Sequence, residues 1–109
     1  VSPTLVRALI PSGEEPVRSH DLSSLRILAS TGEPWNPDPY RWFFEEVGKA
    51  ELPIINLSGG TEVGACFLSP HPISPLEPCT LRGPALGMDV AVFRADGTQA
   101  GPGEVGELV

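Results

Sequence analysis

The sequence predicts an α/β fold, in which a β-α-β unit is followed by antiparallel β-strands. Two short apolar runs, residues 25–29 and 54–57, are bounded by turn residues and are typical of buried strands. Apolar residues at helical spacing lie between them, and apolar–polar alternation marks the C-terminal end. We expect residues 1–68 to form a partial α/β subdomain, and residues 69–109 to form a proline-rich loop and the start of a β subdomain.

The first element in chain order is a helix that begins after Ser2. Ser2 is a good N-cap, and Pro3 suits the first helical position. Residues 11–13, Pro-Ser-Gly, end the helix, and the polar residues 14–24 are expected to form a loop. The apolar face of this helix is expected to consist of Leu5, Val6, Leu9 and Ile10.

The predicted strand at residues 25–29 leads into a turn, residues 30–35, that contains Gly and Pro. A second helix is expected next, with Asn36 as its cap and Pro37 at its first position. Gly48 lies near its end. The buried stripe of this helix is expected to consist of Tyr40, Phe43, Phe44 and Val47.

The second predicted strand, residues 54–57, follows this helix and precedes a glycine-rich turn at residues 58–64. The order strand, helix, strand predicts two parallel strands with a right-handed crossover. Ligands bind such sheets beyond the carboxyl ends of the strands. Because the turns at 30–35 and 58–64 both follow those ends, the sequence predicts a binding site there.

The C-terminal part has the composition of loops and antiparallel strands. Alternation at residues 90–93, a turn at Asp96-Gly97 and a strand at 105–109 predict a hairpin. Since the last predicted strand runs to the end of the sequence, we expect a longer parent protein. Its exposed edge at residues 107–109 could pair with a second copy. An irregular loop is expected over residues 69–79 because of Pro70, Pro72, Pro75 and Pro78.

Composition and charge exclude several classes of function. The net charge of −7 argues against non-specific binding of nucleic acid and against docking on anionic lipid. No apolar run is long enough to span a membrane, and we expect a cytoplasmic protein. Cys66 and Cys79 are too few for a metal site or a disulfide framework and are expected to be reduced and structural. His20 and His71 are expected to lie in solvated loops.

The turn Ser-Thr-Gly-Glu-Pro, residues 30–34, is the first candidate for chemistry. Gly32 permits a positive φ and lets a ligand approach the backbone, and Pro34 fixes the next turn. Glu33 carries a carboxylate, which in its ionised form can accept hydrogen bonds but cannot donate them. A flat heterocycle could lie against this backbone, with its polar edge on main-chain groups. Taken alone, these residues favour the simpler alternative of a strand-to-helix turn with a solvated Glu33.

The second candidate is the stretch Asn-Leu-Ser-Gly-Gly-Thr-Glu, residues 56–62. Its two glycines remove side chains where a ligand must approach, and Ser58 and Thr61 offer hydroxyl donors. Glu62 beside a phosphate makes sense only if a divalent cation lies between them, which suits Mg²⁺. The alternative is a Gly-Gly turn with a surface Thr-Glu pair. The convergence of two such turns favours a site.

Four segments carry a resemblance to a known family: "SPTLVRAL", "DLSSLRILASTGEPWNPDPYRWFFEEVGK", "NLSGGTEVG" and "GPGEVGELV". In order and spacing, they resemble the middle of the acyl-CoA synthetases related to acetyl-CoA synthetase. These AMP-forming enzymes belong to the adenylate-forming superfamily. The resemblance covers essentially the whole chain, and the Gly-Glu-Pro turn, aromatic helix and Thr-Glu loop are its most specific part.

The resemblance implies a reaction and a set of site residues. The family activates a small-molecule carboxylate with Mg²⁺ and ATP, forms an acyl-adenylate and pyrophosphate, and transfers the acyl group to coenzyme A. By this resemblance, Thr61 hydrogen-bonds the α-phosphate and Glu62 holds Mg²⁺, and these two residues are the implied catalytic residues. The implied nucleotide-binding residues, for ATP or AMP, are Gly32, Glu33, Pro34, Asn56, Leu57, Ser58, Gly59, Gly60 and Thr61.

Departures from the family pattern bear on the acyl substrate. Acetyl-CoA synthetases carry two tryptophans and a glutamine where this chain has Ser58, Gly59 and Gly60. Removal of an indole leaves room for several carbons, so we expect an acid larger than acetate. The implied acyl pocket is lined by Thr31, Gly59 and Gly60. The stretch "SGGT" also resembles that of acetoacetyl-CoA synthetases, which typically have aspartate at the position of Glu62.

The family's lysine-containing phosphate loop, ribose-binding aspartate and mobile C-terminal domain have no counterpart in this sequence. We therefore expect the isolated chain to be inactive in adenylation. Two alternatives remain open. One is a non-catalytic module that binds a nucleotide or a partner, and the other is an adenylation domain that loads a carrier protein.

Overall fold

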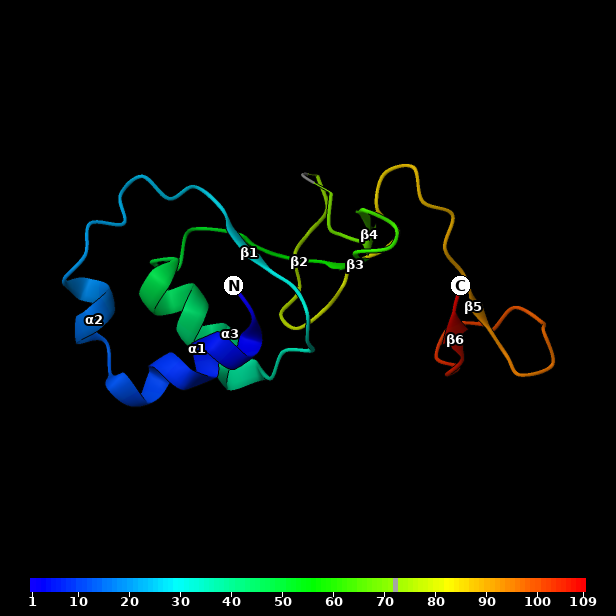
Figure 1. Ribbon diagram of the computed structural model, residues 1–109, viewed down its shortest axis with the longest axis horizontal. Coiled ribbons are helices and arrows are strands. Elements are labelled where there is room, and N and C mark those ends of the chain that lie inside the picture. Colours follow the sequence, from blue (N-terminus) through cyan, green and yellow to red (C-terminus); the bar gives the residue numbers. More distant parts are fainter. Residues whose placement is uncertain (72) are drawn as a thin grey trace.

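A computed structural model describes residues 1–71 and 73–109 of the chain, and these residues form an elongated molecule of 53 × 27 × 26 Å. Figure 1 shows the helices grouped at one end and the strands β5 and β6 at the other. The helical elements are α1 (Pro3–Leu9), a 3₁₀ turn (Ile10–Ser12), α2 (Glu15–Arg18), α3 (Pro37–Trp42) and a π-helical turn (Phe43–Val47). The strands are β1 (Leu28–Ser30), β2 (Ile54–Asn56), β3 (Ser58–Gly60), β4 (Ala65–Leu68), β5 (Val92–Phe93) and β6 (Glu107–Leu108).

The predicted β-α-β unit is present. Strands β1 and β2 are parallel, with Leu28 opposite Ile54 and Ser30 opposite Asn56, and α3 lies between them in the chain. The first strand begins later than residue 25, and Ile27 is 59% exposed, so the prediction of a buried strand over 25–29 is wrong at its start. The ladder opens where the Leu28 amide donates to the carbonyl of Pro53. In a parallel ladder, the N–H of residue 53 would donate the next hydrogen bond back, and proline has no N–H, so regular pairing does not extend further back.

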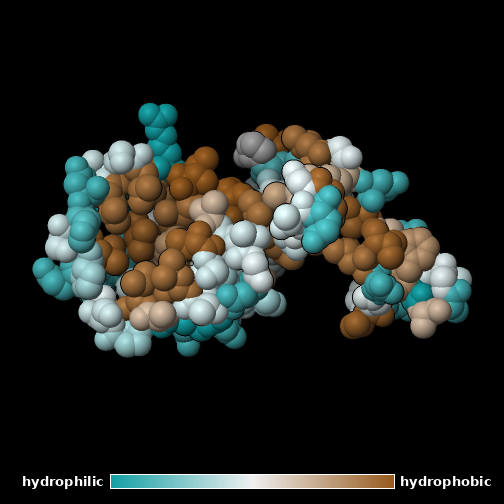
Figure 2. All heavy atoms as spheres, viewed as in Figure 1, coloured by the Kyte–Doolittle hydropathy of each residue, from teal (hydrophilic) through white to brown (hydrophobic). Residues whose placement is uncertain are grey.

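Helix α1 begins as predicted, because the Ser2 hydroxyl accepts a hydrogen bond from the Leu5 amide at 3.2 Å. Its buried side is narrower than expected: Pro3 and Val6 are buried, whereas Leu5 is 46% exposed. Hydrophobic side chains are exposed over much of the helical end (Figure 2). The predicted loop at 14–24 is also wrong in part, since it contains the single helical turn α2.

The core lies between the helices and one face of the β1–β2 sheet. Its buried hydrophobic residues are Val6, Leu28, Trp35, Tyr40, Phe43 and Ile54. The Trp35 ring stacks on Phe43 with centroids 5.8 Å apart, and it meets Tyr40 edge to face at 5.5 Å. The predicted stripe is therefore confirmed for Tyr40 and Phe43, while Phe44 and Val47 are half-buried.

Gly48, which follows the π-helical turn, sets how closely the end of this turn approaches the sheet. A Cβ at this position would lie 2.6 Å from the Phe44 carbonyl oxygen and 3.1 Å from Leu28 Cδ1. The residue is buried and has a helical φ of −83°. The positive φ angles that end the helix are taken instead by Lys49 and Ala50. The glycine is thus required by packing rather than by the turn.

The glycine-rich stretch at 58–64 is only partly the predicted turn: residues 58–60 form a strand, residues 61–64 form the turn, and both belong to a hairpin. Strands β3 and β4 pair antiparallel, with an irregular register at Ser58/Gly59. A Cβ on Gly59 would lie 2.5 Å from the Ala65 carbonyl oxygen, so the glycine lets the two strands come together. The apolar residues after the turn supply the second strand. A Gly-Gly pair can therefore mark close strand pairing as well as a break in structure.

The C-terminal region is antiparallel, as predicted. Strands β5 and β6 pair, and a turn at Asp96-Gly97 brings Gln99 beside Phe93. The expected strand at 105–109 is shorter, since Val105 is 97% exposed and lies outside β6. In the predicted loop at 69–79, the described residues contain no helix or strand, and Pro72 lies outside the described residues.

Across the described ranges, none of the helices has the length and apolar character that crossing a membrane requires.

Candidate functional site

A cavity of about 290 Å³ opens beyond the carboxyl ends of β1 and β2. It brings the two predicted segments together, although they are more than twenty residues apart in the sequence. Residues 31–34 form one side, and residues 56–59 form another. Cys79 and Leu81, from the long C-terminal loop, complete the lining. The position of the cavity agrees with the general rule for parallel sheets.

All four residues of the turn at 31–34 line the cavity. Gly32 has a φ of 98°, a conformation that residues with a side chain rarely adopt. A Cβ there would meet nothing within 4 Å, so the glycine is needed for the backbone conformation and not for space. The turn then places Trp35 in the core. The conformation of the strand-to-helix turn therefore depends on Gly32 near its start and on the buried Trp35 that follows it.

Glu33 is held by helix α1 and is not simply solvated. Its Oε2 accepts hydrogen bonds from the Thr4 hydroxyl at 2.7 Å and from Arg7 Nη2 at 2.6 Å. The Thr4 hydrogen bond and the Arg7 guanidinium hold the pKa of the Glu33 carboxyl below its usual value. Sequence reasoning missed Thr4 and Arg7. The signal that could have found them is their i, i+3 spacing, which places a hydroxyl and a cation on one helix face.

Asn56 at the end of β2 is 6% exposed and holds the opposite side of the cavity in place. Its Nδ2 donates to the Thr80 carbonyl oxygen at 3.0 Å, which ties down the loop that carries Cys79 and Leu81. Partial burial raises the pKa of the Cys79 thiol, so this thiol stays neutral. The sequence gives no local signal for these two lining residues, because a long irregular loop delivers them.

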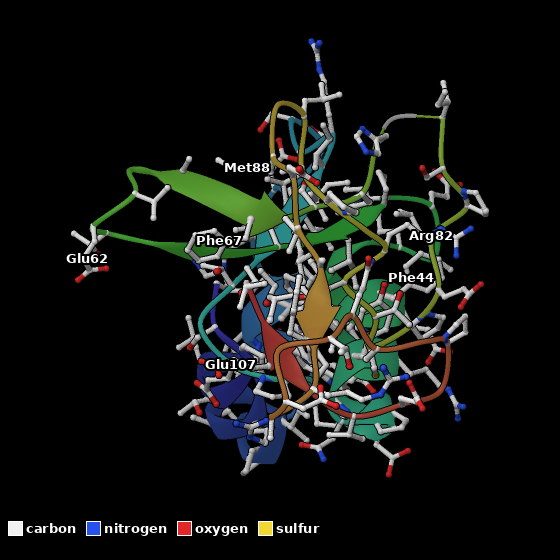
Figure 3. The ribbon with its side chains drawn as sticks, turned by 90° about the vertical axis from the view of Figure 1, so that its right-hand side faces the viewer. Phe44, Glu62, Phe67, Arg82, Met88 and Glu107 are labelled. Atoms are coloured by element: carbon white, nitrogen blue, oxygen red, sulfur yellow. The ribbon has the colours of Figure 1, made fainter. Side chains whose placement is uncertain are left out.

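The remaining predicted site residues do not line the cavity. Gly60, Thr61 and Glu62 belong to the β3–β4 hairpin, and Thr61 and Glu62 are exposed. Figure 3 shows Glu62 at the tip of this hairpin, pointing away from the body of the molecule. Among the described residues, no group of three or more His, Cys, Asp or Glu side chains could hold a metal ion. The structure therefore separates the cavity-lining segments, residues 31–34 and 56–59, from Thr61 and Glu62.

The Thr61 and Glu62 side chains are free to meet a ligand. Across residues 1–71 and 73–109, the Glu62 carboxylate takes part in none of the ion pairs, which join Arg7, Arg18, Arg82 and Arg94 to other acids. A single exposed carboxylate could complete the shell of a Mg²⁺ ion whose other ligands are phosphate oxygens and water. It could not form a metal site alone.

Comparison with known proteins identifies what the chain is similar to. A family model described as "AMP-binding enzyme" matches residues 1–109. The acetyl-coenzyme A synthetase of Chlorobaculum tepidum is 43% identical over 109 residues, which are 99% of this chain and 16% of that protein. The chain thus spans about one sixth of the length of this curated relative.

Solved structures agree with the sequence comparison. The acetoacetyl-CoA synthetase from Streptomyces lividans superposes with a TM-score of 0.84 at 37% identity, covering 98% of this chain and 17% of that one. An anthranilate CoA ligase in complex with anthranoyl-AMP superposes with a TM-score of 0.83 at 27% identity, covering 99% and 20%. The arrangement of β1, α3, β2 and the antiparallel strands is therefore part of the adenylate-forming fold.

Proposed function

The chain belongs to the AMP-binding enzyme family, and on that premise we propose that it supplies part of the active site of an AMP-forming acyl-CoA synthetase. The proposed reaction joins a carboxylate to the α-phosphate of ATP, releases pyrophosphate, and then transfers the acyl group to the thiol of coenzyme A. The observation that carries the proposal is the cavity beyond β1 and β2, lined by the turn at 31–34 and the strand end at 56–59.

We assign the adenine ring to this cavity. Its volume of about 290 Å³ is at the lower limit for small-molecule sites, roughly 300 Å³, and suits one part of a nucleotide. Gly32, Glu33 and Pro34 present backbone to one face of the ring, while Asn56 to Gly60 border the ring and the acyl group. Residues outside the chain would hold the outer phosphates and the ribose.

We assign the α-phosphate to Thr61 and Mg²⁺ to Glu62. Adenylation builds negative charge at the α-phosphorus, where a hydroxyl donor and a cation stabilise the transition state most. The bound Mg²⁺ would neutralise phosphate charge. The exposed position of Glu62 on the hairpin supports this assignment, because its carboxylate is accessible and forms no ion pair with the cations of the described residues.

We further propose an acid larger than acetate, with Thr31, Gly59 and Gly60 at the acyl pocket. The absence of an indole at residues 58–60 supports it, and Thr31 and Gly59 line the cavity beside the residues that would contact the ring, so the acyl group would adjoin the adenine there. Gly59 is an unsuitable place to test it, because a side chain there would collide with Ala65. Thr31→Leu would narrow the same region from the turn at 31–34, at a residue outside the hairpin. It should lower kcat/KM for long acids more than for acetate.

The decisive test is carboxylate-dependent ATP–pyrophosphate exchange by the full-length protein that contains this chain, over a broad panel of acids. Exchange with at least one acid, followed by formation of its CoA thioester, is the expected result. Absence of exchange with every acid would refute the enzyme assignment and favour a non-catalytic nucleotide-binding module. Exchange without thioester formation on CoA would favour an adenylation domain that loads a carrier protein.

Two smaller points follow from the same proposal. We place the enzyme in the cytoplasm, where ATP and coenzyme A are available to it. Pairing of two copies along β6 finds no support in the comparisons. Light scattering of the full-length protein would report its assembly state directly.

A further inference from the structure

We propose that Arg7 is a positioning residue that fixes the shape of the cavity turn from helix α1. This inference rests on the proposed function, because it concerns the turn that would receive the nucleotide. Arg7 Nη2 donates to Glu33 Oε2 at 2.6 Å, and Arg7 Nη1 donates to Asn36 Oδ1 at 3.2 Å. One guanidinium therefore holds the turn on both sides of Pro34.

The turn needs such an anchor because its own backbone does not define one shape. Gly32 permits conformations that other residues avoid, and it lies directly before Glu33. Before Gly32, the Thr31 amide donates to the carbonyl of Val1 at 3.2 Å, and Val1 itself is 51% exposed. Beyond the turn, α3 begins at Pro37. Between Gly32 and the buried Trp35, the side-chain hydrogen bonds of Glu33 to Thr4 and Arg7 hold the turn against helix α1.

Helix α1, which carries Thr4 and Arg7, is itself packed into the core. Helix α1 buries Pro3 and Val6 in the core, on either side of Thr4. The Thr4 hydroxyl donates to Glu33 and accepts from Arg7 Nη2 at 2.9 Å, so it fixes both partners of the ion pair. Arginine suits this task because its planar guanidinium offers several donors in a fixed fork. Lysine would supply the charge at one point only.

The behaviour of Asn36 supports the inference independently. Asn36 stands at the N-cap of α3, where an asparagine side chain ordinarily accepts a hydrogen bond from the first helical turn. Here its side chain makes no capping hydrogen bond and accepts from Arg7 instead. The contact that positions the turn has therefore replaced the contact that would stabilise the helix.

The test compares four variants of the full-length protein: Arg7→Met, Glu33→Gln, the double variant and Arg7→Lys. Arg18→Met is the matched control, because Arg18 pairs with Glu14 and Glu46 away from the cavity. We expect Arg7→Met to raise the KM for ATP roughly three- to tenfold, since the pair is only half-buried, with kcat changed less than about twofold. Arg7→Lys should restore part of the loss, and the double variant should resemble Arg7→Met.

A second readout needs no nucleotide at all. Hydrogen exchange of the free protein should accelerate in residues 31–36 of Arg7→Met and remain unchanged there in Arg18→Met. Unchanged exchange in this turn, or additive effects of Arg7→Met and Glu33→Gln on the KM, would overturn the positioning role. A wild-type protein without ATP–pyrophosphate exchange would refute the proposed function, while hydrogen exchange would still decide the role of Arg7.

Discussion

Glu62, the proposed Mg²⁺ ligand, is an exposed side chain whose role under this proposal lies in the chemistry and not in the fold. It lies at the tip of the β3–β4 hairpin and belongs to no ion pair among the described residues. Glu62→Ala should therefore leave the unfolding temperature of the full-length protein unchanged and lower kcat/KM for Mg·ATP by about two to three orders of magnitude. Glu45→Ala, on the exposed side of the π-helical turn, is the control. Near-normal exchange activity would exclude the metal role.

Glu33 is the opposite case, a carboxylate whose charge serves the fold. Because its pKa lies below the usual value of 4.5 in the folded protein, its ionised form stabilises the folded state. This stabilisation is fully present at pH values above the pKa that the carboxyl group has in the unfolded chain. It is lost as the pH falls through the lower pKa of the folded protein. Wild-type protein should thus be more stable than Glu33→Gln at neutral pH, and the difference should vanish in acid. Denaturant unfolding of both proteins across this pH range measures it, and a constant difference would contradict the assignment.

The two glycines of the β3–β4 hairpin differ at the scale of this element. A Cβ on Gly59 would lie 2.5 Å from a backbone oxygen, whereas one on Gly60 would lie 3.3 Å from Phe67 Cζ, a side chain that can move. We expect Gly59→Ala to destabilise the protein by about 1–3 kcal/mol through displacement of the strands. Gly60→Ala should change the stability by less than about 0.5 kcal/mol. Urea unfolding of the two variants measures both changes in stability. Equal losses of stability would mean that strand pairing does not require Gly59.

How much of each element the sequence predicts depends on where its determinants lie. The start of α1 follows from Ser2 and Pro3, and the start of α3 follows from Pro37, because helix starts are encoded within a few residues. The start of β1 depends on Pro53, which lies across the sheet, so local pattern misplaces it.

The predictability of the site residues also depends on whether their determinants are local. The segments at 31–34 and 56–59 were predictable from their glycines and strand ends, whereas Arg7 and Cys79 reach the turn and the cavity only through tertiary contacts.

The shape of the whole molecule shows how little of its apolar surface the chain covers by itself. The radius of gyration is 16.1 Å, compared with about 13 Å for a compact domain of this length. Large hydrophobic side chains stay exposed along the molecule, among them Ile27, Ile73 and Leu86. Together with the coverage of one sixth of a curated relative, this openness supports the proposal that residues outside the chain complete the active site.

This openness leads to a prediction about the isolated chain of residues 1–109. Because its buried hydrophobic core is small, its free energy of unfolding should fall below the roughly 5–15 kcal/mol of natural domains. It should bind the apolar dye ANS, and it should catalyse no ATP–pyrophosphate exchange, since the described residues hold only the adenine side and the Thr-Glu pair of the proposed site. Circular dichroism during urea unfolding, ANS fluorescence and the exchange assay test these three expectations. Cooperative unfolding at high urea, with exchange activity, would show that the chain is complete in both stability and chemistry, and would refute the division of the active site proposed above.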